Sequence, residues 1–413
     1  MSVAINSPPR RLLTPSRAGY AEHLEQHGPL PPVGPQRKTL LSEIEASGLL
    51  GRGGGGFPTA RKLTAVAAGR RAVIVANGTE GEPASGKDKA LLETSPHLVL
   101  DGVQTAAGLV GAQEAIVAVG RNAGRARAAL EAALAERPGV AAERIRVESV
   151  PDRFVAGEES ALVAWLNGRD AKPTLTPPRP SERGVRGRPT LVQNVETLAN
   201  LALIARHGAR WFRDRETVLV TVLGAVRDSG VIEIQLGTPI RDVLDLCGGR
   251  NEPLRAFLIG GYFGTWIDAR NGSDAPLSAA GLAPLGAALG ARTLVALPQS
   301  ACGLAETACL ASYLAAESAG QCGPCVFGLP AVADCLRTIE RGGKDGLRAL
   351  DRLPRLHAQI RGRGACAHPD GAARLVESAL HVFASEIDRH VHGSCDRRHQ
   401  PLLPVPPSTQ EWR

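Results

Sequence analysis

The stretch AVIVANGTEGEP, residues 72–83, joins a run of apolar, mostly β-branched residues to a turn rich in Gly, Asn and Glu. A short apolar run that ends in turn residues is typical of a buried strand. Similar apolar runs follow at 115–119 and 145–150, and residues 97–109 and 123–136 between them have helical composition. This alternation of strand and helix predicts an α/β domain built on a parallel sheet.

Composition places the chain among globular proteins with room for more than one domain. Of its 413 residues, 43% are hydrophobic, so a substantial core can form. The net charge of +7 arises from 48 Lys and Arg spread among 41 acids, with neither an RNP-type motif nor a basic stripe containing aromatic residues. We therefore interpret the charge as ordinary surface charge and expect no nucleic-acid partner, although small phosphate-bearing ligands would also fit.

The expected compartment follows from what the sequence lacks. No apolar run approaches the roughly 20 residues that span a bilayer, so we expect no direct membrane insertion. The first residues, MSVAINSPPRRLLTPSR, have no apolar segment of the kind found in secretory signals. The eight cysteines are therefore expected in a reducing cytoplasm, where clustered cysteines indicate metal or redox chemistry more often than disulfides.

Changes of pattern along the chain predict five segments. They are a flexible arm (1–36), the α/β domain (37–214), a small α+β module (215–298), a helical region (299–397) and a loose, Pro-rich tail (398–413). Within the α+β module, short strands are predicted at 218–223, 231–235 and 257–259 and a helix at 239–247. The helical region contains seven of the eight cysteines.

A glycine-rich stretch, GRGGGGFPT at residues 51–59, precedes the first strand. Glycines let the backbone approach a ligand and point N–H groups at a phosphate, and the start of the following helix adds positive potential. Lys62 lies one turn into that helix, where its ammonium can reach the same anion. A flexible hinge would look similar, and no Gly-Lys-Ser/Thr ends the stretch as in a Walker loop.

Two polar turns follow predicted strands. In NGTEGEP, residues 77–83, an Asn amide and two carboxylates lie where an open α/β sheet binds ligands, and they could contact the edge of an isoalloxazine or nicotinamide ring. An ordinary acidic turn is the alternative. In GEES, residues 157–160, the two glutamates open a helix, and capping of its N–H groups explains them without any ligand.

The sequence CGPC at 322–325, with Cys366 about forty residues further on, is the strongest local signal. A C-x-x-C pair in a cytoplasmic chain indicates thioredoxin-like redox chemistry, zinc or an iron–sulfur cluster. The absence of a surrounding βαβ pattern disfavours thioredoxin, whereas zinc with a fourth ligand such as His368 remains an alternative.

The remaining cysteines are interpreted as small core or surface residues, because a free buried Cys behaves as a hydrophobe. They are Cys247, Cys302, Cys309, Cys335 and Cys395. Cys395 ends the stretch HVHGSC, which could bind a metal, although a polar tail is the simpler interpretation.

Taken together and in order, these stretches resemble one family. The matching segments are GRGGGGFPT from Gly51, NxxExEP from Asn77, GEESAL from Gly157, KP at Lys172, GRPT from Gly187, NVETL from Asn194 and ESAGQCGPC from Glu317. They are similar to the NADH-binding flavoprotein (F) subunits of bacterial NADH–quinone oxidoreductase (complex I) and of related NAD-linked hydrogenases and formate dehydrogenases. The resemblance extends from about residue 40 to 385.

The resemblance implies a Rossmann-like FMN domain, a ubiquitin-like β-grasp module and a helical bundle that holds one [4Fe–4S] cluster. By position, Gly53, Gly54, Gly55 and Lys62 would bind the FMN phosphate, and Asn77, Glu80, Glu158, Glu159, Asn194 and Thr197 would line the flavin. Phe57 and Glu82 would face the nicotinamide nucleotide, and Arg179 is a further candidate for nucleotide binding. Glu80, Glu82 and Glu159 are the candidate catalytic residues.

The chain departs from the family's cluster motif, C-x-x-C-x-x-C with a distant fourth Cys, because Ala319 occupies the first position. Cys322, Cys325 and Cys366 remain as metal ligands. Three cysteines could hold a [3Fe–4S] centre, or a [4Fe–4S] centre completed by water, His368, Asp370 or a partner; the site could also be empty.

The other departures fall mostly on the nucleotide side. A loop that reads KPPFP in the family has Thr176 and Arg179 in place of its Lys and Phe. Ala65 replaces an aromatic residue after Lys62, and Phe154 replaces a Tyr at the flavin edge. Most of these departures lie where NADH would bind in the family, and NADPH is an alternative because an Arg can bind its 2′-phosphate.

The sequence thus predicts an FMN- and iron–sulfur-dependent oxidoreductase that passes electrons from NADH or NADPH through FMN and a cluster to another protein. A ferredoxin or an iron–sulfur subunit is the expected partner, since neither a thioredoxin-like [2Fe–2S] domain nor a ferredoxin domain is appended. One alternative is a flavin relay between proteins without nucleotide oxidation. Another is a catalytically degenerate ligand-binding or scaffold subunit.

Overall fold

The computed structural model describes residues 11–138, 144–393, 395–397, 400–407 and 411–412. The described residues form two compact units. We call residues 11–81, 86–219 and 411–412 the N-terminal unit, and residues 82–85 and 220–407 the C-terminal unit. None of the described helices is both long enough and apolar enough to cross a membrane.

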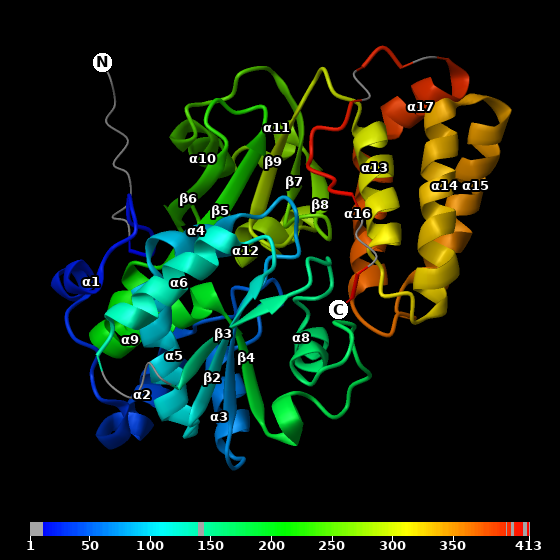
Figure 1. Cartoon of the computed structure of the whole chain (residues 1–413). Helices are drawn as coiled ribbons and strands as arrows, with labels where there is room; N and C mark the ends of the chain where they lie inside the picture. Colours follow the sequence, from blue (N-terminus) through cyan, green and yellow to red (C-terminus); the bar gives the residue numbers. More distant parts are fainter. Residues whose placement is uncertain (1–10, 139–143, 394, 398–399, 408–410, 413) are drawn as a thin grey trace, which may run out of the picture. The chain divides into compact units, whose positions relative to one another are not determined.

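The N-terminal unit is built on a four-stranded parallel sheet, as the sequence predicts (Figure 1). Its strands are β1 (Val73–Gly78), β2 (Glu114–Gly120), β3 (Ile145–Val150) and β4 (Thr190–Asn194), in the order β3-β2-β1-β4. The first three confirm the predicted apolar runs. Strand β4 was not predicted, because its five residues lie between a long Pro-rich loop and a strongly helical segment.

Helices surround this sheet and bury its apolar side chains, as parallel strands require. They are α1 (Tyr20–His27), α2 (Val33–Ser47), α3 (Thr59–Ala67), α4 (Lys87–Thr94), α5 (Pro96–Val110), α6 (Gly124–Glu136), α8 (Glu159–Leu166) and α9 (Val195–Asp214), with a 3-10 turn η1 (Val185–Gly187). Helices α5 and α9 pack so closely that a Cβ at Gly102 would lie 1.9 Å from the Leu198 carbonyl oxygen.

The sheet order fixes where a ligand can bind. The chain steps outward from β1 through β2 to β3, and then returns to place β4 on the other side of β1. This reversal between β1 and β4 is a topological switch point, where open α/β sheets form a crevice at the carboxyl ends of their strands. Asn77 and Asn194, which lie at these ends, are register partners.

The C-terminal unit has a mixed sheet of order β6-β5-β9-β7-β8. Its strands are β5 (Thr217–Gly224), β6 (Gly230–Gln235), β7 (Leu254–Ile259), β8 (Thr265–Asp268) and β9 (Thr293–Pro298), and its short helices are α10 (Ile240–Leu246), α11 (Ala269–Gly272), α12 (Ala279–Leu282) and η2 (Ala283–Leu285). Strands β5, β6 and β7 and helix α10 confirm predicted elements, whereas β8 and β9 were not predicted. This sheet agrees with a small α+β module.

Beyond β9 the chain is helical, as predicted. The helices are α13 (Gly303–Ala316), a π-helical turn η3 (Pro324–Gly328), α14 (Leu329–Arg341), α15 (Gly343–Ile360), α16 (His368–Val382) and α17 (Ala384–His392). Helices α13 to α17 pack against one another as a bundle (Figure 1).

The described parts of the predicted arm and tail are more ordered than the sequence suggested. Within the predicted arm, α1 is helical and Leu12 is buried, whereas residues 1–10 lie outside the described residues. Within the tail, the N–H groups of Leu402 and Leu403 each donate to the Glu306 carboxylate at 2.9 Å, and the Tyr262 hydroxyl donates to the Pro404 carbonyl. The prediction of a loose tail is therefore wrong for residues 402–404.

Candidate functional site

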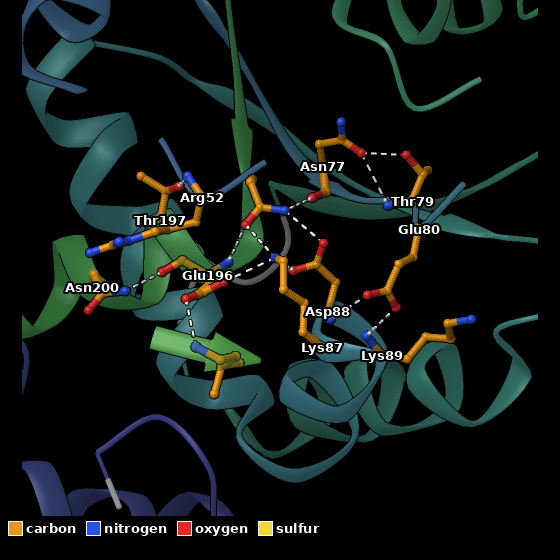
Figure 2. Close-up of polar contacts among 12 residues, drawn as sticks. Arg52, Asn77, Thr79, Glu80, Lys87, Asp88, Lys89, Glu196, Thr197 and Asn200 are labelled. Carbon is orange, nitrogen blue, oxygen red and sulfur yellow. Dashed lines mark hydrogen bonds and ion pairs between the residues drawn. The ribbon is translucent and has the colours of Figure 1, made fainter. Parts of the chain in front are cut away.

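The candidate site lies at the switch point of the parallel sheet (Figure 2). Asn194 ends β4 and caps α9, since its Oδ1 accepts the Glu196 N–H at 3.0 Å. Its Nδ2 donates to Asp88 Oδ2 at 2.8 Å. Asn77 lies near the end of the neighbouring strand and donates from Nδ2 to the Gly157 carbonyl at 2.8 Å. The two amides that the sequence singled out are thus brought together by strand pairing.

A buried ionic cluster, formed by Lys87, Asp88 and Glu196 (Figure 2), lies beside the Asn194 amide, which is hydrogen-bonded to Asp88. Lys87 Nζ is 2.6 Å from Asp88 Oδ1 and 3.0 Å from Glu196 Oε2, and the three side chains are at most 6% exposed. Burial raises the pKa of Asp88 to about 6, although Lys87 acts against this shift. Sequence reasoning missed the cluster, because nothing local shows that Lys87 on α4 faces Glu196 on α9.

The glycine loop, residues 51–56, packs against the start of α9. The Arg52 N–H donates to Thr197 Oγ1 at 2.8 Å, and a Cβ on Gly53 would lie 3.3 Å from that of Asn194. Gly54 has a φ of 100° and so favours glycine on conformational grounds. Gly55 has no such φ, and nothing lies within 4 Å of where its Cβ would stand. Its backbone is therefore open to a ligand.

Lys62 and Glu159 form an ion pair with an Nζ–Oε2 distance of 2.6 Å. Lys62 lies one turn into α3, which follows the glycine loop, and Glu159 begins α8. Both side chains are partly exposed, so either can also meet a ligand from solvent. The structure therefore joins the residue predicted for a phosphate to one predicted for the flavin.

Two of the predicted glutamates cap helices. Glu158 Oε2 accepts the N–H groups of Ser160 and Ala161 at 2.9 and 3.0 Å, at the start of α8. Glu80 accepts the N–H groups of Asp88 and Lys89 at 3.1 and 3.3 Å, in the first turn of α4. The capping alternative considered for Glu158 is confirmed, and Glu80 has the same role. Both carboxylates are thereby fixed beside the strand ends.

The residues predicted for the nucleotide have contacts of their own. Phe57 is 43% exposed and has the Arg61 guanidinium 5.6 Å from its ring centre. Thr176 and Arg179 lie on an exposed loop, where the Arg179 N–H donates to Glu182 at 3.0 Å. Glu82 belongs to the C-terminal unit, where it accepts the Tyr262 N–H at 2.8 Å.

The cysteine site lies in the C-terminal unit, on the segments that follow α13 and precede α16. Cys325 is buried in the π-helical turn, and Cys322 and Cys366 are partly buried. Burial raises the pKa of the Cys325 thiol to about 12, and its interactions with Cys322 and Cys366 act in the same direction. The three cysteines are therefore neighbours despite their separation in sequence.

The side chains considered as a fourth ligand have structural partners. His368 is buried, its Nε2 donates to the Leu314 carbonyl at 2.7 Å, and burial lowers its pKa to about 4. Asp370 accepts the Gly362 N–H at 2.7 Å. Ala319 occupies the position where the family motif has its first Cys, and it is 9% exposed.

Comparison with known proteins gives consistent matches along the chain. Residues 44–203 match the Nuo51 FMN-binding domain, residues 219–261 the SLBB domain, and residues 305–390 the NADH-ubiquinone oxidoreductase-F iron-sulfur binding region. The NADH-quinone oxidoreductase F subunit of Streptomyces coelicolor is 31% identical over 374 residues, covering 86% of this chain and 83% of the relative. The corresponding Escherichia coli protein is 32% identical and covers 84% and 83%.

A solved structure has the same fold. The NAD⁺-reducing [NiFe]-hydrogenase in its H₂-reduced state superposes with a TM-score of 0.80 at 26% identity. The alignment covers 91% of this chain and 67% of the hydrogenase chain.

We predict that Lys87→Met destabilises the protein by about 3–5 kcal/mol, because it leaves the carboxylates of Asp88 and Glu196 buried without their cation. Chemical denaturation monitored by circular dichroism measures the change. Lys89→Met, two positions along on the partly exposed side of α4, is the matched control and should change stability by less than about 0.5 kcal/mol. Equal effects of the two variants would contradict the role given to the ionic cluster.

Proposed function

The chain belongs to the family of NADH-quinone oxidoreductase F subunits, and on this basis we propose that it is an FMN- and iron–sulfur-dependent NAD(P)H dehydrogenase subunit. Its electrons would pass from a nicotinamide nucleotide through FMN and a cluster to a protein acceptor. The observation that carries the proposal is the open glycine loop at the switch point, which leads into α3 and its Lys62.

The residues present fit an FMN phosphate. Helix α3 begins after Pro58 without a side-chain cap, whereas Glu80, Glu158 and Asn194 cap α4, α8 and α9. An anion is favoured at a helix start whose N–H groups no side chain satisfies. We assign the phosphate to the backbone of Gly53, Gly54 and Gly55 and to the Lys62 ammonium.

The isoalloxazine ring would then lie against the polar residues at the ends of β1 and β4. Bound FMN exchanges electron pairs with a nicotinamide and single electrons with an iron–sulfur cluster, which no side chain can do. Asn77, Asn194 and Thr197 would orient the ring, with Glu158 beside them. Glu159 would hold the Lys62 ammonium in position, and Glu80 would fix the start of α4.

Cys322, Cys325 and Cys366 would hold the cluster. Thiolates are the ligands that iron–sulfur clusters use most often, and the three side chains lie together on a helical framework. Because a histidine that binds a metal usually donates its other ring N–H to a carbonyl, the hydrogen bond from His368 to Leu314 does not exclude His368, and three sulfurs with a fourth ligand, or a [3Fe–4S] centre, would describe the site.

The electron acceptor would be a cytoplasmic protein with its own iron–sulfur centre, such as a ferredoxin or a companion subunit. The relatives are named as subunits of NADH-quinone oxidoreductase, which supports such a partner. A flavin relay without direct nucleotide oxidation is the second candidate. The observation that favours it is the altered loop, where Thr176 and Arg179 replace a Lys and a Phe.

The nucleotide would contact residues other than those proposed to bind FMN. Phe57 offers an exposed ring next to the glycine loop, and Arg179 offers a guanidinium that can stack on adenine or bind a phosphate in bidentate fashion. Glu82 remains a candidate from the family resemblance alone.

We predict that Lys62→Ala weakens FMN binding about 10- to 150-fold, equivalent to about 1.5–3 kcal/mol for a charge-assisted phosphate contact. Fluorescence quenching of added flavin by the flavin-free protein measures it. Riboflavin, which lacks the phosphate, should bind both proteins alike, and Arg70→Ala removes an exposed charge nearby as a control. An equal loss for riboflavin would show that Lys62 does not bind the phosphate.

We predict that Cys366→Ser abolishes or strongly changes the cluster signal in electron paramagnetic resonance, because it leaves two sulfur ligands. Cys335→Ser, in the neighbouring helix α14, should leave the signal intact. Ala319→Cys supplies a fourth thiolate and should convert a [3Fe–4S] signal in the oxidised protein into that of a reducible [4Fe–4S] centre. Iron and sulfide at wild-type levels in Cys366→Ser would refute the assignment.

We predict that NADH reduces the bound flavin poorly and that, if either nucleotide works well, it is NADPH. Loss of one aromatic stacking contact costs about 0.5–1.5 kcal/mol, roughly a tenfold loss of affinity at the upper end. Stopped-flow bleaching of flavin absorbance with each nucleotide measures the preference. Arg179→Ala should remove any preference for NADPH, whereas Arg183→Ala on the same exposed loop should not. Fast reduction by NADH that is unchanged in Arg179→Ala would contradict the prediction.

A further inference from the structure

A second group of potential metal ligands lies in the C-terminal unit, outside everything that the proposed function uses. It consists of Cys302, His390 and Cys395, and one ligand atom from each lies within 4.8 Å of the others. Cys302 and His390 are buried, and Cys395 is partly exposed. From the sequence, both cysteines are expected to be small core or surface residues, although the stretch HVHGSC that ends at Cys395 could also bind a metal.

The histidine is oriented as a metal ligand would be. His390 Nδ1 donates its proton to the Glu340 carbonyl at 2.7 Å, so the lone pair of the neutral ring is on Nε2. Nε2 lies 3.2 Å from Cys302 Sγ. Histidines that bind metals usually donate the other ring N–H to a carbonyl or carboxylate in this way, which fixes the tautomer and the ring plane.

Cys302 is placed to act as a thiolate ligand. It is the N-cap of α13, and its Sγ accepts the Ala305 N–H at 3.4 Å, an arrangement that favours negative charge on sulfur. A thiolate buried this deeply needs a cation beside it, and a bound metal ion supplies one. Because only 1% of Cys302 is exposed, no substrate can reach it, which argues against a catalytic Cys–His pair.

The distances between the three ligand atoms are compatible with one small metal ion. Zinc–sulfur and zinc–nitrogen bonds of about 2.3 and 2.0–2.1 Å in a tetrahedral site separate two sulfurs by about 3.8 Å and a sulfur from a nitrogen by about 3.6 Å. The 3.2 Å between Cys302 Sγ and His390 Nε2 needs an expansion of only a few tenths of an ångström. Two thiolates and an imidazole favour zinc over the oxygen-preferring magnesium or calcium.

We propose that Cys302, His390 and Cys395 bind one Zn²⁺, with water in the fourth position on the partly exposed side of Cys395. The ion binds two thiolates and neutral imidazole, so binding releases one proton from each thiol and no electron is transferred. The site would tie the end of α17 to the start of α13.

This connection would reinforce contacts that already hold the same region. Glu386 on α17 accepts the Gly303 N–H at 2.8 Å and is paired with Arg255 at 2.8 Å. Further along, Leu402 and Leu403 are bonded to Glu306 on α13. A bound ion would therefore anchor the chain between α17 and these tail residues.

The test uses the full-length protein, purified under anaerobic conditions with its iron–sulfur site reconstituted. Elemental analysis should find one zinc per chain in addition to iron. Co²⁺ added after zinc removal should give the visible bands of a tetrahedral site and the sulfur-to-cobalt charge-transfer band. Cys395→Ser, outside any helix, should weaken Co²⁺ binding by at least about 100-fold, the upper range for loss of even an outer-shell partner.

Two controls separate this site from others. Cys309→Ser, on the same helix α13, should keep the cobalt bands. Cys366→Ser should keep them too, because it alters only the proposed cluster, so the test does not depend on the proposed function. Wild-type protein without zinc or cobalt bands would overturn the proposal. Unchanged binding in Cys395→Ser, bands lost in Cys366→Ser, or a Cys302–Cys395 disulfide found by mass spectrometry would also overturn it.

Discussion

The buried ammonium of Lys87 is the interaction on which the candidate site depends most. It connects α4, which carries Asp88, to α9, which carries Glu196, and it lies 3.5 Å from the Asn194 amide oxygen at the end of β4. Glu196 in turn accepts the Leu219 N–H at 3.2 Å. Charges buried this deeply are costly unless they are paired, so these elements are held in one arrangement. The ion pairs therefore hold α4 and α9 in position next to the Asn194 amide.

Features that depend on residues close together in the sequence could be predicted, whereas features that depend on distant residues could not. Strands β1, β2 and β3 were predictable because each is a continuous apolar run bounded by turn residues. Strand β4 was not, because a short apolar run beside a long loop leaves helix and strand equally open. The ionic cluster was not predictable either, since Lys87 and Glu196 come together only after the sheet order has been set.

The site residues likewise divide into those with local contacts, which could be predicted, and those with contacts between distant segments, which could not. The capping of α8 by Glu158 was one of two interpretations of GEES, and the structure shows it. The pairing of Lys62 with Glu159 was not foreseen, because a glycine loop and a helix start 97 residues apart carry no sign of contact. Cys302, His390 and Cys395 likewise gave no common pattern, since the first lies 88 residues before the second.

Capping and ligand binding are compatible for some of these carboxylates and compete for others. Glu158 uses one oxygen, Oε2, for its hydrogen bonds to the first turn of α8, so Oε1 can face a ligand without uncapping the helix. Glu80 uses both oxygens on α4. A ligand that donated a hydrogen bond to Glu80 in place of one of these N–H groups would weaken the start of α4, where Lys87 and Asp88 lie. Glu158 can therefore contribute to binding directly, whereas Glu80 acts first by keeping the ionic cluster in place.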